Sequence, residues 1–418
     1  MWLAGGVVAA IGGLVFCELG TMIPKSGAEV TYIRRIYGPL PAFLSVWLVH
    51  FLLRGMGIAI GVLGFSRYFW SLFYGTDVEV PWWLTKLVAL TVTYAIVALV
   101  ALKPTLTLKF VVVFTAAKFL ALVIIIVAGL VYLLQGHTEN IALGFTGTNT
   151  DPKSWGDAWS GIIWSYLGWE QICIVTSEIQ NPQRNIPIIV GVSVTVVTIL
   201  YILTVTSYHI VLPLSVMIQD VPVAAVFGST TMGEVGRVLL ALAVVISSLG
   251  NVQCTFLTSS RYIHAGAVEG LLPGVLGLVS KRFKTPIVSV IYLTCVTTVF
   301  ILVGDIDYLI GSASFTTFPF FVACAVGVVV MRRTAPTLAR PYRVPLIFPV
   351  LFIAFGLFVF VTPFLSSATW LISVVWVVVL LCGVPIYYLL VKDVMGVQCI
   401  GRGMGEFTRL VARVLDCE

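Results

Sequence analysis

The chain is a series of long apolar runs separated by short polar segments. Most of these runs are close to the roughly 20 residues that a helix needs to cross a bilayer. The runs are continuously apolar rather than alternating between apolar and polar residues, which favours helices over a β-barrel. The pattern predicts an all-α polytopic membrane protein with eleven segments at residues 2–19, 41–69, 82–102, 108–134, 159–176, 188–212, 238–257, 287–303, 308–330, 346–364 and 370–391.

The polar connections alternate in charge along the chain. Arg34 and Arg35 follow the first run and Arg332 follows the ninth, whereas Asp77 and Glu79 follow the second. Basic loops of membrane proteins lie preferentially in the cytoplasm. We therefore expect the connections after the odd-numbered runs, and the C-terminus, to be cytoplasmic.

The spacing of the runs predicts one membrane domain over residues 1–391 and a cytoplasmic tail over residues 392–418. Residues 401–418 are expected to be either a short amphipathic helix on the membrane surface or a disordered segment. The same orientation is expected to place Met1 outside the cell, and no charged n-region or small-residue cleavage site ahead of the first run marks a signal peptide. An N-terminal helix missing from this sequence is one explanation.

Composition supports a membrane protein, since 59% of the 418 residues are hydrophobic and 10% are charged, against about a quarter charged in soluble domains. The net charge of +6 is spread among short loops, which argues against nucleic-acid binding. Six of the eight cysteines lie inside apolar runs, so buried or reduced thiols are expected. No phosphate loop, HExxH sequence or His/Cys cluster is present, so we expect no enzyme, cofactor or metal site.

One run contains a predicted break. Residues 160–187 read SGIIWSYLGWEQICIVTSEIQNPQRNIP, with Gly168 in the middle of the apolar stretch. A broken helix frees backbone amides and carbonyls, which can bind both ends of an amino acid zwitterion. Trp164 could close over such a ligand, and Glu170 either lines its pathway or pairs with a cation such as Arg54. The alternative is that Gly168 only lets another helix pack closely.

Two cations lie inside apolar runs, where inserting a Lys or Arg costs about 2.5–3.5 kcal/mol. Lys118 is about ten residues into its run, and its ammonium could replace a bound sodium ion. The alternative is a lysine that reaches the membrane surface. For Arg54 a structural ion pair is the favoured interpretation.

Four separated motifs carry a resemblance to a known family. They are ELGTMIPKSGAE at 18–29, the 160–187 segment, TSSR at 258–261 and RPYRVP at 340–345. Taken together, they resemble the L-type amino acid transporters, the light subunits of heteromeric amino acid transporters in the APC superfamily. The resemblance implies a LeuT-like inverted-repeat fold of twelve helices, of which the eleven runs match helices two to twelve. The family's first helix, which holds the substrate carboxylate, has no counterpart here.

The resemblance also implies roles for residues at the break. Trp164 matches an aromatic gate, and Ser165 and Leu167 match unwound residues beside the substrate. Relatives usually have a small residue at the position of Leu167, or an aspartate in a member that accepts cationic amino acids. Leucine there favours neutral substrates, unless Glu170 supplies the carboxylate.

Other positions are implied on neighbouring helices. Lys118 matches the lysine that fills a sodium position, and Thr255 matches a polar residue facing it. Asn251 matches a polar residue facing the substrate site, and Thr317 matches a residue near the substrate side chain.

The expected activity is sodium-independent exchange of neutral L-amino acids, with large ones favoured, by alternating access across the plasma membrane. The alternatives are a carrier of cationic amino acids and a truncated, non-transporting or regulatory membrane protein. Residues 71–81 contain no cysteine, although heavy-chain-linked relatives place one there. We therefore expect no disulfide-linked heavy chain, and a noncovalent glycoprotein partner stays open.

Overall fold

The protein is helical throughout the part that the structure describes. The computed structural model describes residues 1–25, 27–75, 80–144, 146, 148–149, 152–219, 221–304, 306–365, 370–391 and 398–417. Its elements are α1 (Trp2–Met22), α2 (Ala28–Tyr37), α3 (Pro39–Ser45), η1 (Val46–Leu53), α4 (Arg54–Tyr74), α5 (Trp82–Leu102), α6 (Pro104–Leu134), α7 (Glu139–Ala142), α8 (Pro152–Tyr166), η2 (Gln171–Glu178), α9 (Pro182–Val211), α10 (Leu214–Met217), α11 (Val223–Val268), η3 (Gly274–Gly277), α12 (Ile287–Val303), α13 (Ile306–Thr334), α14 (Ile347–Leu365), α15 (Trp370–Ile386), η4 (Tyr387–Val391) and α16 (Gln398–Val414).

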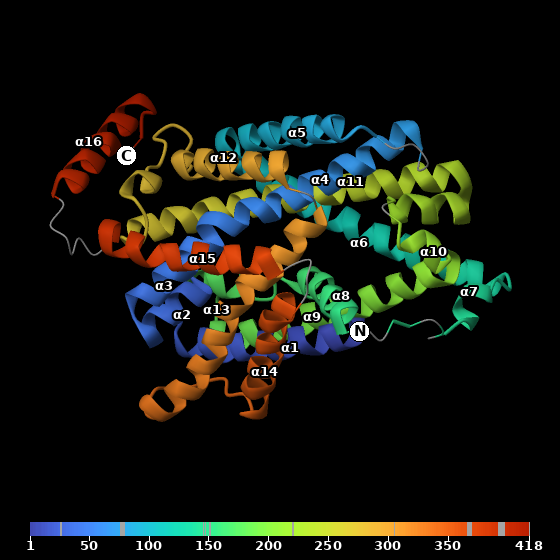
Figure 1. Ribbon diagram of the computed structural model, residues 1–418, viewed down its shortest axis with the longest axis horizontal. Coiled ribbons are helices and arrows are strands. Elements are labelled where there is room, and N and C mark those ends of the chain that lie inside the picture. The colour runs from blue at the N-terminus through green and yellow to red at the C-terminus, as the bar shows by residue number, and fades with distance from the viewer. Residues whose placement is uncertain are drawn as a thin grey trace.

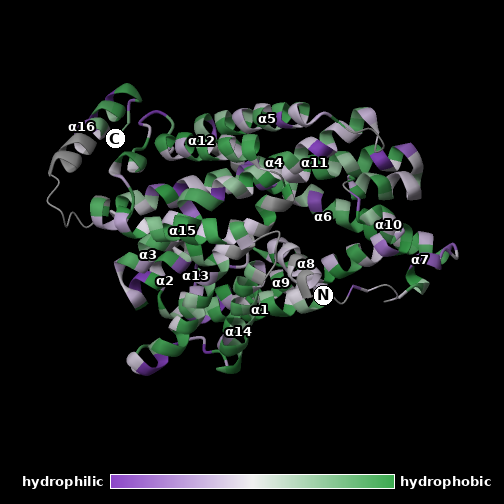
Figure 2. Cartoon of the chain, in the orientation of Figure 1, coloured by the Kyte–Doolittle hydropathy of each residue, from purple (hydrophilic) through white to green (hydrophobic). Residues whose placement is uncertain are grey.

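The predicted all-α membrane architecture is confirmed. Each of the eleven apolar runs coincides with one helix or with consecutive helical segments. Among the described residues, eight helices are long and apolar enough to cross a membrane, and two shorter apolar helices cover Ile287–Val303 and Ser373–Leu389. Apolar residues run along most of the helices, and many of the hydrophilic positions lie near their ends (Figure 2).

One helix is much longer than its apolar run. The run at 238–257 predicts only the centre of α11, which begins at Val223 and ends at Val268. Gly233 interrupts it with a φ of +65°, a conformation that glycine adopts at little cost. The predicted run covers only the most continuously apolar part of α11, so the extensions on either side of it, including the segment before Gly233, were outside the prediction.

Helix α4 holds a central place in the packing. It contacts α5, α11, α12 and α13, while α1 contacts α9, α13 and α14. In Figure 1 α4, α5, α11 and α12 run along one side of the molecule, and α1, α13 and α14 lie on the other. The α4 residues 55–61 therefore face several other helices at once.

The tail contains a helix, α16. Of the two expectations for residues 401–418, an amphipathic helix or a disordered segment, the structure therefore has the helix. It contacts η3, and the N–H of Lys281 donates to the carbonyl of Asp416 at 3.1 Å. The cytoplasmic position of the tail stays a prediction. The cysteines whose side chains are described are free thiols at positions 17, 173, 254, 295, 324, 382 and 417.

Candidate functional site

The helix break predicted around Gly168 is present. Helix α8 ends at Tyr166, Gly168 has a φ of +125°, and the 3-10 helix η2 begins at Gln171. Such a break leaves amides and carbonyls without their helical partners. One of these carbonyls is already satisfied, because the hydroxyl of Tyr201 donates to the carbonyl of Ser165 at 2.9 Å.

Glu170 closes the break from within. Its side chain is 4% exposed, and one carboxylate oxygen accepts from the N–H of Gly168 at 2.9 Å. The other accepts from Nε2 of Gln171 at 2.7 Å. In the described residues it forms no ion pair with Arg54. Both oxygens are therefore occupied by groups of the turn, which leaves them poorly placed to bind a cationic ligand.

Two predicted site residues meet on one face of α4. A Cβ atom at Gly57 would lie 3.3 Å from Cη2 of Trp164, and one at Gly61 would lie 3.9 Å from Nδ2 of Asn251. Residues four apart share a face of a helix. The end of α8 and the middle of α11 thus converge on a strip of α4 that carries no side chains at these two positions.

The predicted cation site is only partly assembled. Lys118 is exposed on α6, which contacts α11. Its ammonium acts electrostatically on the thiol of Cys254, which is adjacent in sequence to Thr255. The hydroxyl of Thr255 donates to the carbonyl of Asn251 at 2.9 Å, and in the described residues it makes no hydrogen bond to Lys118. The sodium-like role of Lys118 stays a prediction.

The remaining candidates lie on α13, α4 and α8. Thr317 is half-buried on α13, a helix that contacts both α8 and α4. Ser165 is half-buried, and its hydroxyl donates to the carbonyl of Gly161 at 2.9 Å. The guanidinium carbon of Arg54 lies 6.0 Å from the ring centre of Tyr262, and no ion pair of Arg54 is present in the described part of the chain. A cation–π contact therefore takes the place of the expected ion pair.

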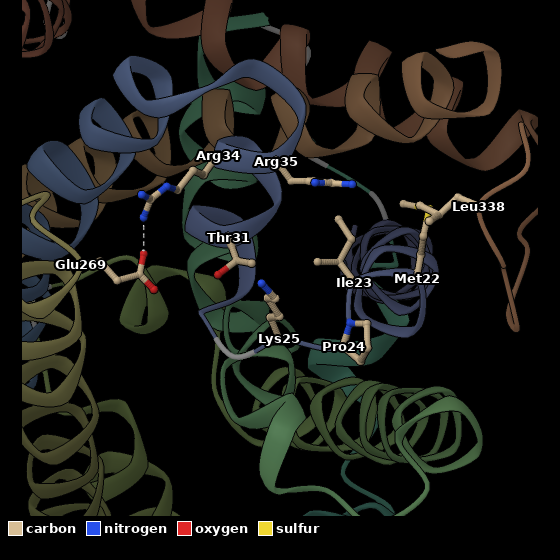
Figure 3. A pocket seen from close by; sticks show the side chains of 9 residues that line it. All are labelled: Met22, Ile23, Pro24, Lys25, Thr31, Arg34, Arg35, Glu269 and Leu338. Carbon is tan, nitrogen blue, oxygen red and sulfur yellow. Dashed lines mark hydrogen bonds and ion pairs between the residues drawn. The ribbon is translucent and has the colours of Figure 1, made fainter. Parts of the chain in front are cut away.

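A separate cavity of about 760 Å³ opens where the end of α1, α2 and the C-terminal end of α11 meet. Lys25, Arg34 and Arg35 line it, and Arg34 forms an ion pair with Glu269 at 2.7 Å (Figure 3). None of the residues predicted for the substrate site lines this cavity. Its excess of cations over carboxylates favours anionic groups.

A profile of the amino acid permease family matches residues 1–385. The chain belongs to this family. The permease is 34% identical to the b(0,+)-type amino acid transporter 1 of Mus musculus, over 100% of this chain and 85% of that relative. It is 30% identical to the cystine/glutamate transporter of Homo sapiens, over 94% of this chain and 77% of the relative. It is also 30% identical to the Asc-type amino acid transporter 1 of Mus musculus, over 98% and 77%.

These matches confirm the resemblance to amino acid transporters of the light-subunit type. They also support the prediction that the protein is a transporter and not an enzyme, because the matched relatives are all named as transporters. The names of these relatives cover more than one kind of amino acid. Membership of the family therefore does not identify the substrate of this permease, which has to be inferred from the site.

Sequence reasoning missed a buried ion pair formed by Glu18, the first residue of one family motif, with Arg332. Glu18 on α1 is 0% exposed and accepts from Nε of Arg332 at 2.9 Å and from its terminal nitrogen at 2.5 Å. The same carboxylate accepts from the N–H of Val344 at 2.9 Å. The pair fixes α1 to the end of α13 and to the RPYRVP segment. A charged residue at the end of each of two apolar runs was the available signal.

Proposed function

We propose that this permease exchanges neutral, preferentially large, L-amino acids across the plasma membrane by sodium-independent alternating access. The helix break at Gly168, opposite the Gly57–Gly61 strip of α4, is the observation that carries the proposal. Backbone groups at a broken helix can bind an amino acid carboxylate and ammonium without an ionised side chain. At Gly57 of this strip the backbone of α4 comes close to the ring of Trp164.

The chemistry at the break supports a neutral substrate. Leu167 is apolar, and the carboxylate of Glu170 is engaged by Gly168 and Gln171. A cationic substrate would have to break both of these hydrogen bonds to reach Glu170. The cationic alternative is therefore disfavoured, and competition for uptake tests it directly.

Sodium independence rests on the proposed role of Lys118, whose fixed ammonium would take the place of a bound sodium ion. A partner chain, if present, would be held noncovalently. Residues 71–81 contain no cysteine, and residues 76–79 lie outside the described part of the chain.

The test is leucine uptake into proteoliposomes that contain the purified permease in sodium-free buffer. We expect labelled leucine to enter vesicles loaded with unlabelled leucine much faster than empty vesicles, and excess arginine or lysine to compete weakly. Equal uptake into loaded and empty vesicles would exclude exchange. Strong competition by arginine and lysine would favour the cationic carrier, and binding without uptake would favour a non-transporting, regulatory protein.

A further inference from the structure

The cavity at the end of α1 has no part in the proposed substrate site. Its volume of about 760 Å³ lies within the roughly 300–1,000 Å³ that is typical of small-molecule sites. Segments far apart in the sequence build its walls: the end of α1 with the turn after it, α2, the residue after α11, and Leu338 beyond α13. In Figure 3 the side chains of Ile23, Lys25, Thr31 and Arg35 surround one open space.

The lining carries more positive charge than the surrounding chain neutralises. Lys25, Arg34 and Arg35 are cations, and Glu269 is the one carboxylate among the described residues that line the cavity. Glu269 is already paired with Arg34 at 2.7 Å. The ammonium of Lys25 and the guanidinium of Arg35 make no ion pair or hydrogen bond with the described part of the chain. Two positive charges at the cavity are therefore left without a protein partner.

Membrane topology alone does not account for this arrangement. A basic connection satisfies the preference for the cytoplasmic side wherever its side chains point. Arg34 and Arg35 lie in the last turn of α2, where cations stabilise a helix end. Lys25 lies outside any helix, and it lines the same cavity as Arg35. The convergence of these cations on one space calls for a ligand.

The charge and the donor types favour a phosphate group. A phosphate monoester carries about −1.5 to −2 charges near neutral pH, which matches the two positive charges left over. A guanidinium can donate to two phosphate oxygens at once, and an ammonium adds a point charge. A neutral amino acid fits less well, because Lys25 and Arg35 would repel its ammonium. The cavity is therefore poorly suited to be a second amino acid site.

The remaining walls favour a phosphate that is attached to an apolar group. Met22 and Ile23 are 7% and 8% exposed, and Pro24 and Leu338 add further apolar surface to the lining. The basic connection that contains Arg35 is expected in the cytoplasm, and the cytoplasmic leaflet carries anionic lipids. Basic pockets between transmembrane helices on that side bind phosphorylated lipid headgroups.

We propose that this cavity binds a phosphorylated anion, with Lys25 and Arg35 as its main contacts and Arg34 beside them. The phosphate belongs either to the headgroup of an anionic phospholipid or to a soluble compound, and the apolar walls favour the lipid. The proposed site does not depend on amino acid exchange.

The test measures binding of a fluorescent, water-soluble phosphatidylinositol bisphosphate to the purified permease in detergent, followed by fluorescence anisotropy. We expect saturable binding to the native protein. Lys25→Gln and Arg35→Gln should each weaken binding by about tenfold or more, because each removes a charged donor to phosphate. Glu269→Gln should strengthen binding by about twofold to fivefold, because it removes the carboxylate of the lining and releases Arg34.

Arg333→Gln is the matched control, because Arg333 is an exposed arginine at the end of α13 that does not line the cavity. It should bind as the native protein does. No binding to the native protein, or equal losses in Arg333→Gln and Arg35→Gln, would overturn the site. If Arg35→Gln does not fold, Lys25→Gln and Glu269→Gln decide the matter, because they should change the affinity in opposite directions.

Unlabelled competitors identify the source of the phosphate. Competition by the unlabelled lipid alone would assign a phospholipid headgroup, whereas equal competition by inositol trisphosphate or inorganic phosphate would assign a soluble phosphate. Both outcomes support an anion site in this cavity. Equal competition by a phosphatidylcholine of the same chain length would contradict it, because that lipid has no net charge and shares only the acyl chains.

Discussion

Neutralising Glu18 should destabilise this permease strongly, because it leaves a charge buried without its partner. Glu18→Gln keeps the size of the side chain and removes its negative charge. The guanidinium of Arg332, whose side chain is 9% exposed, then stays buried opposite a neutral amide. The N–H of Val344 keeps an acceptor in the amide oxygen, but the amide –NH2 then replaces the oxygen that accepts from Nε of Arg332, so the pair loses its charge and one hydrogen bond.

The magnitude follows from the burial of both partners. Breaking a buried pair by removing one charge costs about 3–5 kcal/mol. Unfolding entropy is about 2.1 cal/mol/K per residue, or about 0.9 kcal/mol/K for 418 residues. Dividing the lost free energy by this unfolding entropy gives a fall in the unfolding temperature of about 3–6 °C.

The assay is thermal unfolding of the purified protein in detergent, followed by intrinsic fluorescence. Glu269→Gln is the control, because it breaks the Arg34–Glu269 pair, whose side chains are 45% and 50% exposed. Exposed pairs contribute about 0–1 kcal/mol, so the control should shift by about 1 °C or less. Adding Arg332→Met to Glu18→Gln should restore part of the lost stability. Equal shifts for Glu18→Gln and Glu269→Gln would refute the reasoning.

Substitutions at Gly57, Trp164 and Lys118, with Gly64→Ala as a control, test the substrate and cation sites through sodium-free leucine exchange. Gly57→Val should slow exchange by about tenfold or more, the effect of 1.4 kcal/mol, because its side chain meets Trp164. Gly64→Ala should be neutral, because a Cβ there meets nothing within 4 Å, and equal losses would argue against a site on α4. Trp164→Ala should raise the leucine concentration for half-maximal exchange, while Trp164→Phe retains closure, and unchanged kinetics in both would remove the gate. Lys118→Met should slow exchange similarly, or make it sodium-dependent, and native behaviour would exclude the cation role.

The local sequence was enough to predict the membrane-spanning segments, because these depend only on the length and hydrophobicity of each run. The length of each apolar run sets whether it can span the hydrocarbon core, and every predicted run coincides with one or more helical segments. The break at Gly168 was also predictable, because glycine inside a helix with polar and aromatic neighbours tolerates a positive φ. The motifs gave the family, which the comparisons confirm.

Contacts between distant residues were decided only by the tertiary structure. Glu18 and Arg332 are 314 positions apart in the sequence. A hydropathy profile contains no information on which buried charges form a pair. The same limit applies to the buried contact between Nε2 of His50 and Oε1 of Glu29, which lie 3.0 Å apart. In the sequence, His50 is only one polar residue in an apolar run. The sequence also left Glu170 open between a pathway acid and an ion pair, whereas the folded chain uses it to cap Gly168. Apolar periodicity thus determines which segments enter the membrane, and packing determines the partner that each buried polar group finds.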